Sequence, residues 1–331
     1  MKRNAFKCLS VMLVLAMLVP MMLTGCGPKK ETVVIYTSVE DYVIEDMNKR
    51  LSEQFPDYNI IVEYQSTGNH AGKLKNEGKS TECDITYDLE YAYMEQLAQA
   101  GVLADLSEYD TSIYMDGTIV SKNYLLQCRV GGAVILNTEV LKEKGKPEPT
   151  TYKDLLDPMY KGLISMANPK SSGTGYMFYK FLVDAWGEEE ALAYFDQLAP
   201  NVLQFTGSGS GPVNALLQKE VAIGFGMTSQ AVQEINDGQP LKVVYLDLPS
   251  PYTLYGMSMI AGKDARPAVK EVFDFLVKTY SYELNEKFFP EQMFKDKVVE
   301  LENYPKDIVY SEMKNNTIAE KERLLEKWKH Q

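Results

Sequence analysis

The chain has 331 residues, of which 45% are hydrophobic, and carries a net charge of −12. This acidity excludes nucleic acid as a partner and disfavours binding to an anionic membrane surface, because like charges repel. The length exceeds what one hydrophobic core usually supports, so we expect two lobes. The only histidines are His70 and His330 and there is no CxxC motif, so a zinc site has little to be built from. We expect no bound metal and no cofactor.

The N-terminus has the order of an export signal. A basic start is followed by an apolar run from about residue 8 to residue 23, which is short for a membrane span. The tetrapeptide Leu23-Thr24-Gly25-Cys26 resembles the lipobox of bacterial lipoproteins, in which the cysteine becomes the lipid-bearing first residue. We therefore expect a signal peptide at 1–25, a lipid on Cys26 and a tether at 26–31. The alternatives are an ordinary secretory signal and an uncleaved anchor helix.

The next part of the chain alternates strand and helix patterns. Strands are expected at 32–36, 58–64 and 83–87, each followed by a helical pattern. This alternation predicts an α/β fold, a mostly parallel sheet flanked by helices. Ligands of such sheets bind at the carboxyl ends of the strands. Polar residues stand at those ends in this chain, namely Thr37, Ser38, Ser66, Thr67 and Asp88.

The second half of the chain resumes the alternation after a stretch broken by prolines. Strands are predicted at 131–137, 163–166, 221–226, 241–245 and 255–261, and the remainder to Gln331 is predicted to be mainly helical. We expect lobe 1 to consist of 32–136 and 256–331, and lobe 2 of 137–255. Asn137 and the region of Tyr255 and Gly256 would then be the hinge strands.

Two loops rich in glycine and hydroxyl groups begin helices in the predicted second lobe. Ser171–Gly175 joins a strand to a helix, and Ser208–Gly211 precedes a helix with Pro212 at an early position. Free N–H groups and the positive dipole end at a helix N-terminus attract an anion. The first loop lacks the lysine of a P-loop, so nucleotide hydrolysis gains no support. The alternatives are plain helix capping for the first loop and a flexible surface turn for the second.

Several other side chains have both a functional and a structural interpretation. Asp88 and Glu90 could receive a cationic group of a ligand, or could simply be solvated at a helix start. His70 could contact a phosphate, or could be an exposed histidine. Cys83 and Cys128 could form a disulfide outside the cytoplasm, or remain two separate buried thiols. A group of tyrosines falls near the predicted cleft, where such residues are more often structural: Tyr36, Tyr42, Tyr176, Tyr252 and Tyr255.

An ordered set of motifs resembles the solute-binding proteins of ABC importers. After the lipobox come VVIYTS, YQSTG, CDITYDL, GGAVILNT, NPKSSGTGY, TGSGSGPVNALLQKEVAIGFG and YGMSMIAGKDARPAVKEVFDFL. More narrowly, the chain is similar to the type II periplasmic binding proteins that capture ferric iron, 2-aminoethylphosphonate, hexose phosphates or related solutes. The resemblance implies two α/β lobes joined by hinge strands, with the ligand between them. It also implies delivery of the solute to an ABC permease and its ATPase subunit.

The resemblance implies a ligand site at matching positions, to which we add Asp88, Thr228 and Tyr255. The candidate contacts are Tyr36, Thr37, Ser38, Ser66, Thr67, Asp88, Ser172, Gly173, Thr174, Ser208, Gly209, Ser210, Thr228 and Tyr255. Iron-binding members usually place adjacent tyrosines where this chain has Met227-Thr228-Ser229-Gln230, which do not replace phenolate ligands of a ferric ion. We therefore expect a small anionic solute, either a phosphonate such as 2-aminoethylphosphonate or a sugar phosphate. Ferric iron is the alternative.

An enzyme is the competing class of protein. An extracytoplasmic phosphate-ester hydrolase would need a nucleophile with a base or a metal cluster, and only His70 is plausibly placed as an imidazole base. A structural lipoprotein or adhesin would not need hydroxyl-rich loops in both lobes. We expect no catalytic residue and no enzymatic activity. The protein should be a monomer outside the cytoplasm, held at the membrane through a lipid on Cys26.

Overall fold

The structure is a computed structural model that describes residues 30–291 and 293–331. The predicted signal peptide and Cys26 lie outside the described residues. Within the described part of the chain, no helix combines the length and apolar character that a membrane span requires.

The first lobe is built on the three strands that the sequence pattern predicts. β1 (Thr32–Thr37) lies between β2 (Asn59–Tyr64) and β3 (Ile85–Glu90), and both neighbours run parallel to it. The helices that follow these strands are α2 (Asp41–Gln54), α3 (Thr67–Glu77) and α4 (Tyr91–Gln99). A returning strand, β9 (Tyr252–Met259), is antiparallel to β3. The alternation along the chain therefore does produce a mostly parallel sheet with helices on its faces.

The second lobe repeats this arrangement around β5 (Ile164–Ala167), which is parallel to both β6 (Val202–Thr206) and β7 (Ile223–Met227). β8 (Leu241–Val244) is antiparallel to the long strand β4 (Leu125–Asn137). The helices of this lobe are α5 (Thr138–Glu143), α6 (Gly173–Trp186), α7 (Glu188–Leu198), α8 (Gly211–Leu217) and α9 (Thr228–Asn236). β6 was not predicted, because its residues are exposed or only partly buried and therefore lack a clear apolar pattern.

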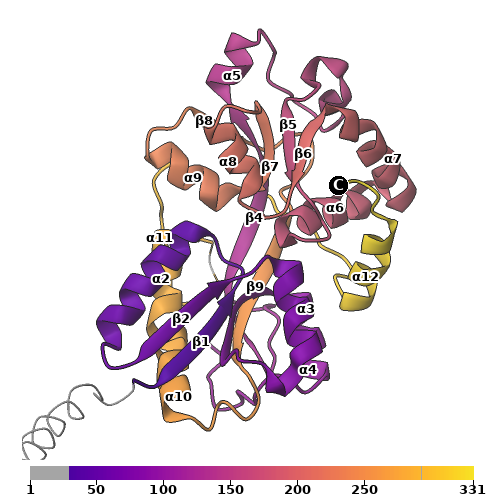
Figure 1. The fold of residues 1–331 in the computed structure, drawn as a ribbon. Helices are drawn as coiled ribbons and strands as arrows, with labels where there is room; N and C mark the ends of the chain where they lie inside the picture. Colours follow the sequence, from indigo (N-terminus) through magenta and orange to yellow (C-terminus); the bar gives the residue numbers. More distant parts are fainter. Residues whose placement is uncertain (1–29, 292) are drawn as a thin grey trace, which may run out of the picture.

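Two strands connect the lobes (Figure 1). The first part of β4 pairs with β9 as far as Gly131, and from Gly132 onward β4 pairs with β7 instead. The sequence analysis placed this change at Asn137, which instead ends β4 and caps α5 by accepting a hydrogen bond from the Val140 N–H. A Cβ at Gly132 would lie 2.5 Å from Cε of Met177, so the lack of a side chain lets α6 approach this crossing. The lobe boundaries themselves stay a prediction.

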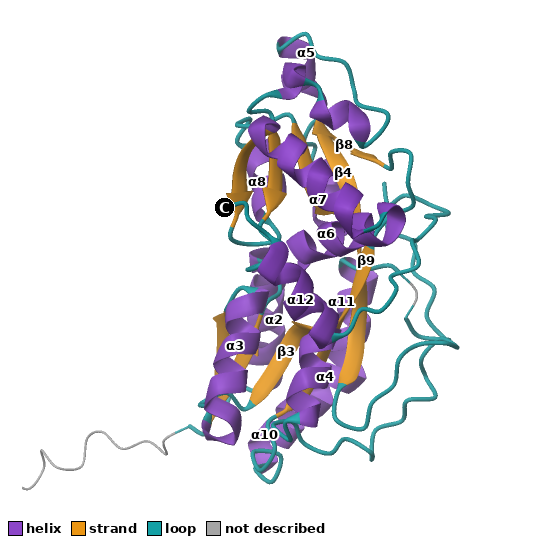
Figure 2. Cartoon of the chain, turned by 90° about the vertical axis from the view of Figure 1, so that its right-hand side faces the viewer, coloured by secondary structure: helices purple, strands orange, loops and turns teal. Residues whose placement is uncertain are grey.

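The C-terminal part is less helical than predicted. After α10 (Pro267–Phe275), a π-helical turn at Leu276–Tyr280 and α11 (Ser281–Lys287), the described chain forms no helix until α12 (Ile318–Lys327). Figure 2 shows long loops on the side of the molecule where β9 lies. Leu324 and Trp328 pack into the core of the second lobe, while α12 also contacts α4 of the first. The C-terminal helix therefore touches both lobes.

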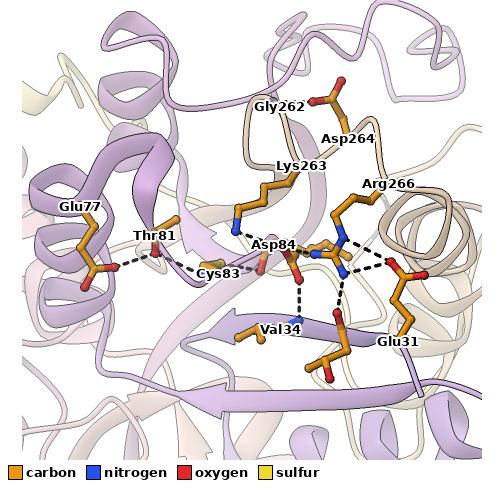
Figure 3. Close-up of polar contacts among 12 residues, drawn as sticks. Glu31, Val34, Glu77, Thr81, Cys83, Asp84, Gly262, Lys263, Asp264 and Arg266 are labelled. Atoms are coloured by element: carbon orange, nitrogen blue, oxygen red, sulfur yellow. Dashed lines mark hydrogen bonds and ion pairs between the residues drawn. The ribbon is translucent and has the colours of Figure 1, made fainter. Parts of the chain in front are cut away.

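A polar cluster fixes the first-lobe sheet at the end of β3 that faces away from the predicted cleft (Figure 3). The buried carboxylate of Asp84 accepts a hydrogen bond from the Val34 N–H at 3.0 Å. It also pairs with Arg266 at 2.7 Å and with Lys263 at 3.4 Å. Cys83, next to Asp84, and Cys128 are both buried and form no disulfide, so the interpretation as separate thiols is confirmed.

Candidate functional site

A narrow pocket lies between the lobes, lined mainly by hydroxyl groups from both. The first lobe contributes Ser38, Glu40, Tyr64, Ser66, Thr67 and Tyr255, and the second contributes Ser171, Ser172, Thr174, Ser208 and Gly209. The pocket holds about 10 Å³, which is about the space that one water molecule needs. The lobes are therefore close together, and a solute of several heavy atoms enters only when they separate.

The N-terminus of α6 touches the first lobe directly. The Gly68 N–H donates a hydrogen bond to the carbonyl oxygen of Ser171 at 3.2 Å. A Cβ on Gly173 would lie 2.5 Å from the hydroxyl oxygen of Tyr255 and 3.4 Å from Oγ1 of Thr67. A glycine at position 173 is thus what allows this close approach of the lobes.

The N-terminus of α6 also offers hydrogen-bond donors for an anion. Oγ of Ser172 accepts a hydrogen bond from the Gly175 N–H at 3.3 Å, so Ser172 does cap α6 as the structural interpretation holds. Capping uses the oxygen and leaves the hydroxyl proton free to donate. The N–H groups of Gly173 and Thr174, in the first turn, have no carbonyl partner within the helix. Capping and anion binding are therefore compatible here.

The second glycine-rich loop packs on the first. A Cβ on Gly209 would lie 2.4 Å from Oγ1 of Thr174 and 3.4 Å from Oγ of Ser172, so only glycine fits between these hydroxyls. Ser208 and Ser210 hydrogen-bond to each other through their hydroxyls at 3.2 Å. Ser208 and Gly209 of this loop line the pocket.

His70 is buried, and the expectation of an exposed histidine was wrong. Its Nδ1 lies 2.8 Å from Oγ of Ser38, and its Nε2 lies 3.0 Å from Oγ1 of Thr86. Burial, with a smaller contribution from the charge of Lys73, lowers the pKa of His70 to about 3, so the imidazole is neutral. The spacing of His70 from Leu74 on α3 is the signal that could have shown its inward orientation, because residues four apart share a helix face.

Some predicted ligand contacts lie behind the pocket. Tyr36 is buried, and Nζ of Lys73 lies 4.2 Å from the centre of its ring. Oγ1 of Thr37 accepts a hydrogen bond from the Val39 N–H at 3.2 Å. Oγ1 of Thr228 lies 3.4 Å from the hydroxyl of Tyr245. None of these three predicted contacts is among the described residues that line the pocket, and the same holds for three further predicted contacts, Asp88, Gly173 and Ser210.

One carboxylate, Glu40, lines the first-lobe side of the pocket, and a second, Asp88, lies behind it, near enough for its charge to act on Glu40. Asp88 is buried, and one of its oxygens accepts a hydrogen bond from Nε2 of Gln127 at 2.8 Å. Burial raises the pKa of Asp88 to about 7, and burial together with the charge of Asp88 raises the pKa of Glu40 to about 8. The solvated helix start considered for Asp88 was wrong, and Glu40 was not anticipated at all.

A buried lysine bridges the lobes beside the pocket. Nζ of Lys321, on α12, pairs with Glu90 at 2.6 Å and lies 4.2 Å from the ring centres of both Tyr93 and Tyr176. Tyr93 belongs to α4 of the first lobe and Tyr176 to α6 of the second. Glu90 is therefore ion-paired inside the protein, and the interpretation of Glu90 as a solvated residue at a helix start was wrong. Lys321 was missed because a charged residue on a C-terminal helix predicts an exposed position.

Comparison with known proteins places this architecture among binding proteins. Residues 46–289 match the family model described as bacterial extracellular solute-binding protein. An uncharacterized protein of Haemophilus influenzae is 28% identical over 249 residues, which are 72% of this chain and 70% of that protein.

Solved structures of periplasmic binding proteins are also similar to this chain. The periplasmic binding protein AfuA of Actinobacillus pleuropneumoniae, solved with exogenous fructose-6-phosphate bound, has a TM-score of 0.78 and 27% identity over 91% of this chain and 98% of its own. The periplasmic binding protein P5PA has the same TM-score at 22% identity, covering 90% and 98%. Iron-bound HitA of Pseudomonas aeruginosa has a TM-score of 0.71 at 16% identity, covering 89% and 98%. With a two-lobed fold, a pocket between the lobes and a family match over most of its length, this chain belongs to the bacterial extracellular solute-binding proteins, in the type II periplasmic binding protein group.

Proposed function

We propose that this protein captures a small anionic solute, either a phosphonate such as 2-aminoethylphosphonate or a sugar phosphate, for import. As a member of its family, it is the solute-binding component of an ABC transporter and works outside the cytoplasm. One observation supports the proposal that the ligand is an anion. The first turn of α6 and hydroxyl groups of both lobes converge on a single pocket. No lysine or arginine is among the described residues that line it, so N–H and O–H donors would hold the anion.

The comparison with AfuA supports a phosphorylated ligand. That protein is 27% identical to this chain over most of its length and was solved with fructose-6-phosphate bound. HitA, solved with iron, is only 16% identical and is similar in fold alone. At the position where iron-binding members carry adjacent tyrosines, α9 begins with Thr228, Ser229 and Gln230, all buried. Hydroxyl and amide groups suit a phosphoryl group better than a ferric ion.

Anchoring and partners complete the proposal. We expect a lipid on Cys26 to hold a monomer at the membrane, beside the ABC permease that receives the solute and the ATPase subunit of that permease. The mass of the N-terminal peptide of the protein purified from membranes would test the lipid. A peptide that begins with diacylated Cys26 is expected, and an unmodified N-terminus would contradict it.

The ligand class is tested by calorimetry of the purified protein with 2-aminoethylphosphonate, glucose-6-phosphate, fructose-6-phosphate and ferric citrate. We expect binding of a phosphonate or a phosphate ester and none of iron. Thr174→Val removes one donor and keeps the shape of the side chain, so affinity should fall on the order of tenfold to a hundredfold. The unfolding temperature of the variant serves as the control for folding. Unchanged affinity in a folded Thr174→Val protein, or binding of iron alone, would refute the assignment. Turnover of a phosphate ester would show an enzyme instead.

A further inference from the structure

The carboxylates of Glu40 and Asp88 form a feature that an anion-binding pocket does not need. Glu40 lines the pocket, and although it precedes the first turn of α2, its side chain makes no capping hydrogen bond. Asp88 has a positive φ of 56°, at an irregularity in the pairing of β3 with β9. Backbone conformations of this kind cost free energy and concentrate at functional sites.

No basic side chain balances this pair within the described part of the chain. The charges that act on Glu40 are those of Asp88 and Asp41, and the partners of Asp88 are Gln127 and Cys128. The salt bridges among the described residues include neither carboxylate, whereas the nearby Glu90 has Lys321. Asp88 is buried and Glu40 is partly buried, and carboxylates removed from water without a cation are costly. A positive charge supplied from outside would therefore be bound strongly.

Polar atoms without hydrogen-bond partners surround the same place. Ser229, on α9 of the second lobe, is only 2% exposed, and its hydroxyl faces that of Tyr42, on α2 of the first lobe. Neither hydroxyl has a further hydrogen-bond partner among the described residues. The charges of both Glu40 and Asp88 act on the Tyr42 hydroxyl. Oε1 of Gln127, whose amide nitrogen binds Asp88, is a further buried acceptor without a donor.

From this arrangement we propose that the pocket has a cation-binding half, formed by Glu40 and Asp88 with Tyr42, Ser229 and Gln127, opposite its anion-binding half at α6. The solute is then a zwitterion that carries an ammonium group a few bonds from its phosphonate or phosphate. This inference rests on the proposed function and narrows it, because a sugar phosphate has no cationic group. An ammonium donates three hydrogen bonds, which matches acceptors on both carboxylates and on the unpartnered side chains.

The competing role for Glu40 makes a distinct prediction. In that role a protonated Glu40 donates a hydrogen bond to the anion of the solute. Glutamine would reproduce that donation, so Glu40→Gln would then preserve affinity. If Glu40 binds an ammonium as a carboxylate, the same substitution removes the charge and weakens binding.

The test uses matched ligands that differ only in the cation. Calorimetry would compare 2-aminoethylphosphonate with propylphosphonate, and phosphoethanolamine with propyl phosphate, so that a methyl group replaces the ammonium. The wild type should bind the aminated member of a pair on the order of tenfold to a hundredfold more tightly. Glu40→Gln and Asp88→Asn should each reduce this preference by about tenfold or more. Asp41→Asn, which removes the exposed charge next to Glu40, is the matched control and should leave the preference unchanged.

The outcomes separate this inference from the proposed function. Equal affinity of the wild type for both members of each pair overturns the cation-binding half. Binding of a sugar phosphate but of no aminated ligand overturns it as well, and in both cases the proposed function stands. The inference is also overturned if Glu40→Gln and Asp88→Asn fold normally and still prefer the aminated ligand of each pair as strongly as the wild type does. Failure of every phosphonate and phosphate ester to bind would refute both proposals. The wild-type comparison requires no variant, so it remains decisive even if a substitution impairs folding.

Discussion

The hydroxyl oxygen of Ser38 lies 2.8 Å from Nδ1 of the buried, neutral His70, whose Nε2 is in turn 3.0 Å from Oγ1 of Thr86. A neutral imidazole carries one N–H, so one nitrogen donates and the other accepts. If Nδ1 carries the proton, Ser38 accepts from His70 and keeps its own proton for the solute. Thr86 then donates to Nε2. Ser38 lines the pocket, so this tautomer is the one that suits an anionic ligand.

This relationship predicts that His70 acts on the ligand only through Ser38. Ser38→Ala and His70→Ala should each reduce affinity for the phosphorylated solute, by roughly threefold to tenfold for a neutral hydrogen bond. The double variant should lose little more than Ser38→Ala alone, because both remove the same interaction. Calorimetry on the two single variants and the double variant measures this coupling. Additive losses of affinity would show that His70 is merely structural. Nitrogen-15 chemical shifts of the imidazole would report the tautomer directly.

A second prediction concerns closure of the lobes. Since a Cβ on Gly173 would lie 2.5 Å from the Tyr255 hydroxyl, Gly173→Ala should hold the lobes apart. Solute should make the wild type more compact in small-angle scattering, as hinge closure requires. The variant should show less compaction and weaker binding. Gly72→Ala on α3 is the control, because nothing lies within 4 Å of a Cβ at that position. Equal compaction of Gly173→Ala and the wild type would contradict the assignment of Gly173 to the closing contact.

A third prediction concerns the lysine that bridges the lobes. Lys321→Met leaves the carboxylate of Glu90 buried without its cation and should reduce the free energy of unfolding by about 3–5 kcal/mol. Adding Glu90→Gln should restore much of this loss, because the remaining group is then neutral. Thermal or urea unfolding of the single and double variants provides the measurement. If the double variant is as unstable as Lys321→Met, the packing of Lys321 between Tyr93 and Tyr176 matters more than its charge.

The sequence predicted the features that depend on local pattern. Alternating apolar segments located β1, β2 and β3, and the small polar residues at their ends led to Ser38, Ser66 and Thr67, which do line the pocket. The features it missed depend on contacts between distant segments. The residues of β6 are exposed or only partly buried, so no apolar periodicity marks this strand.

Glu40 and Lys321 show the same limit for charged residues. Glu40 precedes the first turn of α2 and Lys321 lies on α12, and charged side chains at such positions are ordinarily exposed to water. Glu40 is at the pocket only because the second lobe closes over it, and Lys321 is buried only because α12 lies against both lobes. Neither contact can be predicted from the local sequence.

The last prediction is the effect of pH on the protein when its lobes are closed over Glu40, as they are in the structure. The pKa of Glu40 is raised to about 8, first by burial and then by Asp88, while an unfolded glutamate has a pKa of about 4.3. Between these values the unfolded chain releases the proton that the folded protein retains, so stability falls as the pH rises through this window. His70 acts in the opposite direction, because its lowered pKa costs stability as the pH falls below about 6.5. The range from pH 6.5 to pH 8 therefore isolates the carboxylates.

Glu40→Gln removes the titrating group while keeping its shape. The groups that remain around position 40 are Asp88, Asp41, Tyr42, Tyr255 and Cys128, and they are common to both proteins. At pH 8 the variant should unfold roughly 5–15 °C higher than the wild type, since the pKa of Glu40 is almost 4 units above that of an unfolded glutamate and one unit corresponds to about 1.4 kcal/mol. At pH 5 the two should unfold at nearly the same temperature. Calorimetric unfolding at several pH values provides the comparison, with Asp41→Asn as the exposed control. Parallel curves for the wild type and Glu40→Gln would show that Glu40 is solvated in the ligand-free protein, and that closure over this carboxylate is weak until a solute neutralises it.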